Sequence, residues 1–214
     1  MPERYEFQRE LDVLHKDLTK MGAVIEKTMD DMIEALITQN TQLAQEIIER
    51  DEEINKMELQ VEKECILLIA RQQPIASDLR DIAAVLKIIT DLERIADHCA
   101  DISEYTIKLS KEHYLKPIIH IPEMVEKVKA MVKDAIDSSV KKDLELAKSI
   151  CERDDEVDNY FDTIIEELID LMKEDSENIR QCKDFMFIVK YLERMGDHAT
   201  NIAEWVIYTV TGSH

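Results

Sequence analysis

Apolar residues recur every three or four positions along most of the chain, which is the spacing of one face of an α-helix. The first such segment covers about residues 4–38, and a second runs from about 42 to 72. Because proline cannot continue a helix, Pro74 ends the second segment, and Ser77 is the predicted N-cap of a third segment over about 78–111. The first half is therefore predicted to hold three long helices.

The second half repeats this plan. Periodic segments cover about residues 122–139, 143–173 and 176–210, and the last ends before Gly212. Between the halves, the segment 108–122 carries two prolines and several basic residues in an otherwise acidic chain. It is typical of a hinge between domains. We therefore place a domain boundary between residues 115 and 116.

Two stretches of sequence occur twice. Residues 91–104, which contain Leu-Glu-Arg-Ile-Ala-Asp-His, return as 191–204 with Leu-Glu-Arg-Met-Gly-Asp-His, and the Glu-Arg-Asp segment 49–55 returns as 152–158. The two offsets, of 100 and 103 residues, differ by only a few positions. Such repetition indicates duplication of one three-helix unit. The predicted fold is all-α, with two tandem three-helix bundles over residues 1–115 and 116–214 and six long antiparallel helices.

Composition agrees with helices and limits the partners. Only 3 Gly and 4 Pro occur among 214 residues, which argues against sheets with many turns. A formal net charge of −20 disfavours nucleic acid and anionic membrane surfaces, and favours cations and basic protein surfaces. The N-terminus has no signal-peptide pattern, and no apolar run is long enough to insert into a bilayer. A cytoplasmic location is expected.

The repeated segments place acidic residues in rows. Glu93, Asp97 and Asp101 are four residues apart, so they stack on one side of a helix, and Asp51 lies within the apolar arc of the preceding helix. Carboxylates beside a core require neutralisation. One solution is a cation bound by oxygen ligands, with Fe, Mn or Mg favoured over zinc. The candidate metal ligands are Asp51, Glu58, Glu93, Asp97, Asp101, Asp154, Asp158, Glu193, Asp197 and Asn201.

The alternative solution is a network of interhelical salt bridges. An arginine stands next to an acid at four repeated positions, Arg50, Arg94, Arg153 and Arg194. Guanidinium groups pair well with carboxylates, and both solutions can coexist. The sequence therefore leaves the choice between cation and salt bridges open.

Other chemistry-bearing residues give weaker patterns. The four cysteines lie far apart and are predicted to be small buried side chains. His98 and His198 point away from the acidic rows, which indicates a surface or interhelical role, and neither belongs to a Glu-x-x-His pair of a di-iron bundle. No phosphate-binding loop, nucleophile elbow or zinc set occurs. No catalytic residue and no organic cofactor site is predicted.

The duplicated Leu-Glu-Arg-x-x-Asp-His row, together with the upstream Glu-Arg-Asp row, resembles the PhoU family of phosphate-uptake regulators over nearly the whole chain. The resemblance implies two three-helix bundles, multinuclear metal sites in some members and dimers in many. It also implies a non-enzymatic adaptor between the ATPase of the phosphate ABC transporter and its sensor histidine kinase, which holds uptake and the starvation response down. The alternative is a metal-carboxylate enzyme or a metal-storage protein. Because Asn55 and Asn201 are neutral where the other repeat has Asp, weaker cation binding is expected.

Overall fold

The computed structural model describes residues 2–72, 74–115 and 120–212, which form helices and loops without a strand. The first half contains α1 (Pro2–Thr38), α2 (Thr41–Gln72) and α3 (Ala76–Leu109). The second half contains α4 (Ile121–Lys141), α5 (Leu144–Cys151), α6 (Asp154–Glu174), the 3₁₀ turn η1 (Ser176–Asn178) and α7 (Ile179–Thr211). The all-α prediction is confirmed. The hinge prediction falls partly on residues 116–119, outside the described residues.

Two local predictions differ from the structure. The helix predicted over 143–173 is divided, because the Nε of Arg153 donates to the carbonyl of Ser149, while its backbone N–H turns to Ile150 instead. In a continuous helix the Ser149 carbonyl would accept from the backbone N–H of Arg153, but here it accepts from the Arg153 side chain. The N-cap prediction at Ser77 is wrong, since α3 begins at Ala76 and Ile75 occupies the cap without a side-chain hydrogen bond.

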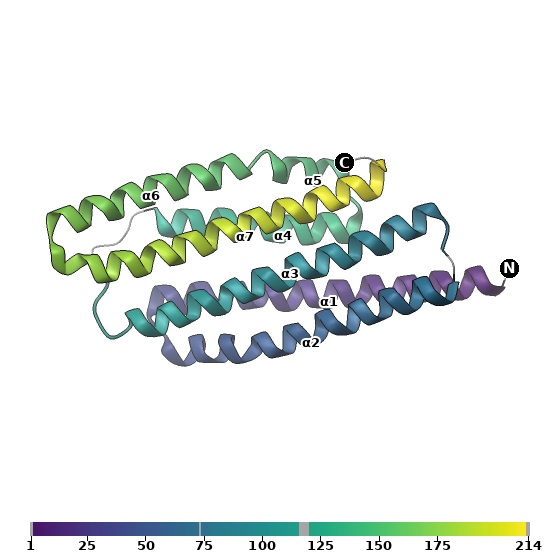
Figure 1. Ribbon diagram of the computed structural model, residues 1–214, viewed down its shortest axis with the longest axis horizontal. Coiled ribbons are helices and arrows are strands. Elements are labelled where there is room, and N and C mark those ends of the chain that lie inside the picture. Colours follow the sequence, from purple (N-terminus) through teal and green to yellow (C-terminus); the bar gives the residue numbers. More distant parts are fainter. Residues whose placement is uncertain (1, 73, 116–119, 213–214) are drawn as a thin grey trace.

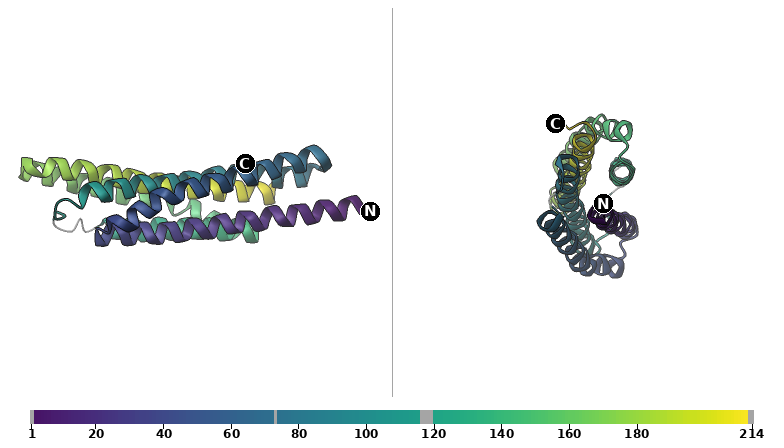
Figure 2. Two further views of the ribbon diagram at one scale, coloured as in Figure 1. Left: turned by 90° about the horizontal axis from the view of Figure 1, so that it is seen from below. Right: turned by 90° about the vertical axis from the view of Figure 1, so that its right-hand side faces the viewer.

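The helices form two layers. In Figure 1, α3 and α7 cross the centre side by side, with α2 beside α3 and α6 beside α7. The two views in Figure 2 place α1 and α4 behind this layer, where α1 packs on α2 and α3, and α4 packs on α7. Buried apolar side chains from both halves form one hydrophobic cluster. The repeated halves are therefore joined along α3 and α7. These two helices carry the glutamate and aspartate of the repeated Leu-Glu-Arg-x-x-Asp-His segments.

Ion pairs reproduce the duplication in three dimensions. Arg50 on α2 binds Asp31 on α1 at 2.7 Å, and Arg153 at the start of α6 binds Asp134 on α4 at the same distance. Both partners are shifted by the same 103 residues between the halves. Because both residues of the salt bridge recur 103 positions later and pair again, the sequence repeat is also a repeat of structure.

Further ion pairs connect the two halves. Asp81 of α3 is buried, and its carboxylate accepts from Lys142 Nζ at 2.7 Å and pairs with His15 Nε2 at 3.1 Å. At the other end, Asp184 of α7 is buried and accepts from Lys108 Nζ of α3 at 2.7 Å. Since each buried carboxylate would be costly without its partner, these pairs specify how the halves pack.

Candidate functional site

The first acidic row lies between α2 and α3. Asp51, Asn55 and Glu58 come from α2, and Glu93 and Asp97 come from the facing side of α3. All five side chains are half-buried. Glu58 Oε1 accepts a hydrogen bond from Thr90 Oγ1 at 3.2 Å, which links the two helices at one end of the row. The structure therefore brings together predicted ligands that are about forty residues apart in the sequence.

Burial, together with repulsion between neighbouring charges, raises the pKa values of three carboxylates in this cluster. Burial raises the pKa of Asp51, and the charges of Asp97 and Asp101 add to that rise. Burial likewise raises the pKa of Glu58. Within this row the pKa of Glu93 rises to about 7, because of burial and the charge of Asp97. A cluster that disfavours its own negative charges attracts protons or cations.

Two oxygens in the same row lack hydrogen-bond partners in the described part of the chain. They are Oδ1 of Asp51 and Oδ1 of Asn55, and both atoms are buried. The Asn55 amide meanwhile donates to the other Asp51 oxygen at 3.2 Å. A buried acceptor without a partner costs free energy, so these oxygens are free to take a cation.

The second acidic row lies between α6 and α7 and is more open. Asp158 and Asp197 are exposed, whereas Asp154 and Glu193 are half-buried. Burial raises the pKa of Asp197, with Glu193 and Asp154 as the main charged neighbours. The pKa of Asp158 is raised by burial and then by Asp154. Four of the five predicted ligands therefore gather here, but with greater access to water than in the first row.

Asn201, the fifth predicted ligand of the second row, is hydrogen-bonded to the other half of the protein. Its amide donates to Asp91 Oδ1 of α3 at 3.3 Å, and the same oxygen pairs with His198 Nδ1 at 2.8 Å. On α3 itself, His98 Nδ1 lies 3.3 Å from Asp101, and the two imidazole rings are 5.7 Å apart. The interhelical role predicted for the histidines is confirmed by the contacts of His198 with Asp91 and of the two rings with each other. The prediction that His98 points away from the acidic row is wrong, because its Nδ1 pairs with Asp101 of that row. Asp91 was missed, because sequence periodicity does not reveal which helices of the two halves will meet.

The predicted arginine network is only partly present. Arg94 does bind the row, with Nη1 at 2.8 Å from Asp97 and Nε at 3.5 Å from Glu93. Arg50 and Arg153, by contrast, bind Asp31 of α1 and Asp134 of α4 and form no ion pair with the rows among the described residues. Lys190, which sequence analysis missed, binds Glu193 at 2.6 Å. The first row thus has one arginine for several carboxylates, and its charge is incompletely neutralised.

The fit to a metal ion can be judged from this arrangement. Oxygen donors, two of them buried and unpartnered, suit a hard cation. Yet within the described residues no group of three or more His, Cys, Asp and Glu side chains is arranged to hold a metal ion. The donor set therefore fits in chemistry, and side-chain rotation would be needed to complete coordination.

Glu93→Gln should stabilise the metal-free protein at pH 8 by about 1–2 kcal/mol. A pKa shift from 4.5 to about 7 disfavours the folded state as Glu93 ionises, so stability is lost between pH 4.5 and 7 and the loss persists above. The full shift would correspond to about 3 kcal/mol, and access of water to the half-buried cluster reduces it. Urea unfolding with a chelator at pH 4 and pH 8 measures the effect.

The matched control for this prediction is Glu53→Gln, an exposed carboxylate on the opposite side of α2. It removes the same charge without touching the row, so no gain at pH 8 is expected. An equal gain in both variants would attribute the effect to net charge and would contradict the assignment to Glu93.

An all-α protein of duplicated three-helix units, with a carboxylate row in each unit, is the class that fold and site define. A family model described as PhoU domain matches the chain twice, over residues 18–106 and 121–206. The chain belongs to the PhoU family.

Relatives and solved structures agree with this assignment. A protein of Clostridium acetobutylicum named phosphate-specific transport system accessory protein PhoU homolog is 42% identical over 96% of this chain and 94% of its own length. The crystal structure of PhoU from Pseudomonas aeruginosa matches with a TM-score of 0.94 and 38% identity, covering 97% of this chain and all of that one. The Streptococcus pneumoniae PhoU structure gives 0.89 and 29%, covering 97% and 98%.

Proposed function

We propose that this chain is an accessory protein of a phosphate transport system that works as a regulatory adaptor and carries out no chemistry of its own. It holds phosphate uptake and the phosphate-starvation response down when phosphate is ample, by contacting the transporter ATPase and a sensor histidine kinase. The observation that carries the proposal is the double match to the PhoU family, together with relatives that are named as accessory proteins of the phosphate-specific transport system.

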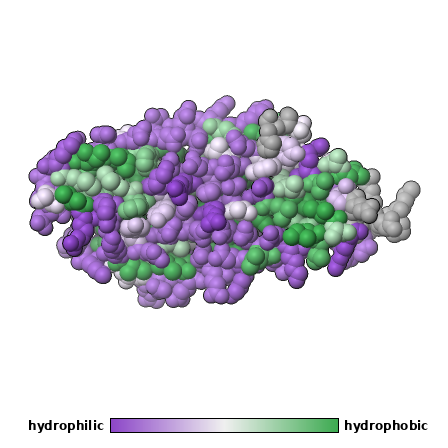
Figure 3. All heavy atoms as spheres, in the orientation of Figure 1, coloured by the Kyte–Doolittle hydropathy of each residue, from purple (hydrophilic) through white to green (hydrophobic). Residues whose placement is uncertain are grey.

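The surface chemistry supports protein partners. The net charge of −20 favours encounter with basic surfaces. Among the described residues, no helix is long and apolar enough to cross a membrane. Figure 3 shows hydrophobic residues gathered on the right of one face, over α2 and α3. Leu59 and Ile66 of α2 and Leu79 of α3 are exposed. Exposed apolar clusters of this kind are typical of interaction sites.

The homodimer remains a prediction, and this α2–α3 patch is the surface that we propose a second copy would cover. Sedimentation of the wild type and of Leu59→Gln/Ile66→Gln measures it. A dimer that dissociates in the variant supports the proposal. Ile37→Gln/Val210→Gln, which removes two exposed apolar side chains elsewhere, is the control and should leave the dimer intact.

We also propose that the acidic rows hold Fe, Mn or Mg. Asp51, Glu58, Glu93, Asp97 and Asp101 would hold the cation in the first row, and Asp154, Asp158, Glu193 and Asp197 would do so in the second. When bound, the cation supplies positive charge. The chain's own residues gather the oxygens, and Arg94 and Lys190 neutralise part of their charge.

Deleting the gene should switch phosphate-starvation genes on in phosphate-rich medium. A transcriptional reporter measures this, and a plasmid copy of the wild-type gene should restore repression. The proposed contacts are tested separately with purified protein, by titrating it against the transporter ATPase and against the kinase's cytoplasmic portion. Normal repression in the deletion strain, or the absence of binding to both proteins, would contradict the adaptor role.

A further inference from the structure

A groove between α1 and α2 lies on the opposite side of α2 from the acidic row. Two cavities of about 240 Å³ and about 440 Å³ follow each other along these helices and share Glu64. The groove covers residues 9–20 of α1 and 53–71 of α2. At 1.5 Å per residue these stretches measure about 16 Å and about 27 Å, which is the length of three to five helical turns.

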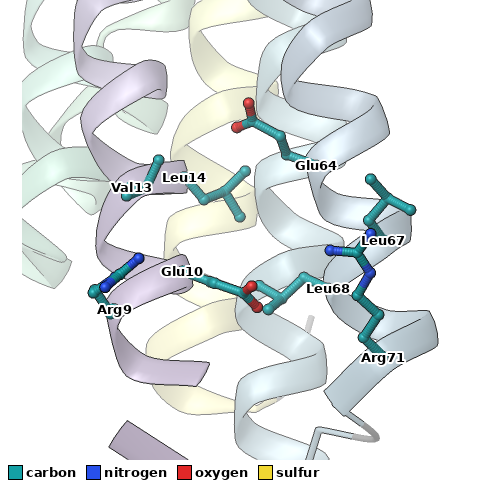
Figure 4. A pocket seen from close by; sticks show the side chains of 8 residues that line it. All are labelled: Arg9, Glu10, Val13, Leu14, Glu64, Leu67, Leu68 and Arg71. Atoms are coloured by element: carbon teal, nitrogen blue, oxygen red, sulfur yellow. The ribbon is translucent and has the colours of Figure 1, made fainter. Parts of the chain in front are cut away.

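The groove combines an apolar floor with charged edges. Leu14, Val61 and Leu68 are buried at the floor, whereas Val13 and Leu67 are 48% and 37% exposed. Figure 4 shows Leu14 of α1 and Leu68 of α2 in the space between the two helices, with Val13 and Leu67 at its edges. An apolar strip of this length between two antiparallel helices suits the apolar face of a further helix.

The charges along the groove give the occupant a definite pattern. At one end, Figure 4 shows Arg9 on α1 and Arg71 on α2, with the carboxylate of Glu10 between them. Two guanidinium groups against one carboxylate leave this end of the groove with a net positive charge. Further along, Oε1 of Glu64 accepts from Gln60, but Oε2 is buried and has no partner in the part that the structure describes. Charge complementarity therefore requires acidic residues at the arginine end and a donor opposite Glu64.

We propose that the α1–α2 groove binds an amphipathic helix of a partner protein, with acidic residues beside Arg9 and Arg71 and a lysine or arginine that reaches Glu64. The helix completes a four-helix arrangement with α1, α2 and α3. Because the groove and the acidic row lie on opposite sides of α2, both surfaces can be engaged together. This site does not depend on the metal proposal or on which regulator is bound.

The probe is a fluorescein-labelled synthetic helix of about sixteen residues, with leucines at i, i+3, i+4, i+7 and i+11, one central lysine at the edge of that stripe and two glutamates at one end. A second peptide has the glutamates at the other end, because the groove admits either direction. Anisotropy titration gives Kd. At least one peptide should bind wild type, and Arg9→Glu/Arg71→Glu should weaken it about tenfold or more, which is a loss of about 1.4 kcal/mol.

Charge exchange distinguishes this site from general attraction. A peptide with lysines in place of the end glutamates should bind the Arg9→Glu/Arg71→Glu variant about tenfold better than wild type. Glu64→Gln should weaken the peptide with the central lysine and leave unchanged one with leucine there. Lys87→Glu/Lys111→Glu changes the net charge equally at exposed positions outside the groove and should have no effect on any of these ratios.

Several outcomes would overturn the proposal. One is that neither peptide binds the wild-type protein. Another is that the peptides bind wild type and the Arg9→Glu/Arg71→Glu variant with equal affinity. A third is that the Lys87→Glu/Lys111→Glu control also loses affinity for the peptides. Protection of the groove by self-association, measured by sedimentation with and without peptide, would assign it to a second copy instead. Circular dichroism and urea unfolding confirm that each variant is folded. Failure here would leave the adaptor proposal standing, since the reporter assay does not involve this groove.

Discussion

Adding Mn²⁺, Fe²⁺ or Mg²⁺ to metal-free protein should raise its free energy of unfolding, by about 2.7 kcal/mol when the bound ion is present at a hundred times its Kd. The reason is linkage, since a cation held between α2 and α3 or between α6 and α7 binds only the folded chain. Asp97→Ala/Asp197→Ala should abolish most of this gain. Metal analysis of purified protein and thermal unfolding with and without chelator measure both effects.

The first row should contribute more than the second. It has the two buried, unpartnered oxygens, whereas Asp197 in the second row is exposed. Asp97→Ala alone should therefore reduce bound metal more than Asp197→Ala alone. The matched control, Asp12→Ala/Asp170→Ala, removes two exposed carboxylates away from the rows and should leave the metal response unchanged.

A different outcome would favour the salt-bridge explanation. If Arg94 is the main neutralising group, Asp97→Ala should destabilise the protein to the same extent with and without added ions, because the lost interaction is a local ion pair at 2.8 Å. If neither the chelator nor any of the three ions changes the melting temperature of the metal-free protein, the proposed metal role is excluded.

Asp31→Ala should destabilise the protein by about 2–3 kcal/mol, as it leaves Arg50 without its carboxylate. The side chains of Arg50 and Asp31 are only 18% and 19% exposed, and the pair is 2.7 Å apart. Breaking a fully buried pair costs about 3–5 kcal/mol, and the remaining water access lowers this value. Arg50 also keeps its hydrogen bond to Thr28 Oγ1. Urea unfolding in the presence of chelator measures the change.

The duplicated pair supplies the control. Asp134→Ala leaves Arg153, whose side chain is 29% exposed, so a smaller loss of about 1–2 kcal/mol is expected. Asp31→Leu/Arg50→Met, which removes both charges, should recover much of the stability lost in Asp31→Ala. If the double variant is as unstable as the single one, the cost does not come from a stranded arginine.

The helical class, the duplication and most helix ends follow from the sequence alone. Apolar residues at helical spacing extend through both halves, and helix formation depends mainly on near neighbours. The repeated segments then place carboxylates of one helix in register, as in Glu93 and Asp97. Local periodicity is sufficient for these features, because residues four apart must share one side of a helix whatever packs against it.

Only the tertiary structure decided how the rows are neutralised and where the halves meet. The same Glu-Arg-Asp triplet lies inside α2 at Asp51 but interrupts the helix before Asp154, because Arg153 bonds back to the Ser149 carbonyl and binds Asp134. Asn201 belongs to a repeated row, yet it donates to Asp91 of the other half. Burial of the rows and the ion pairs between helices arise from tertiary packing, and the pattern of a single helix does not show which helices will pack against it.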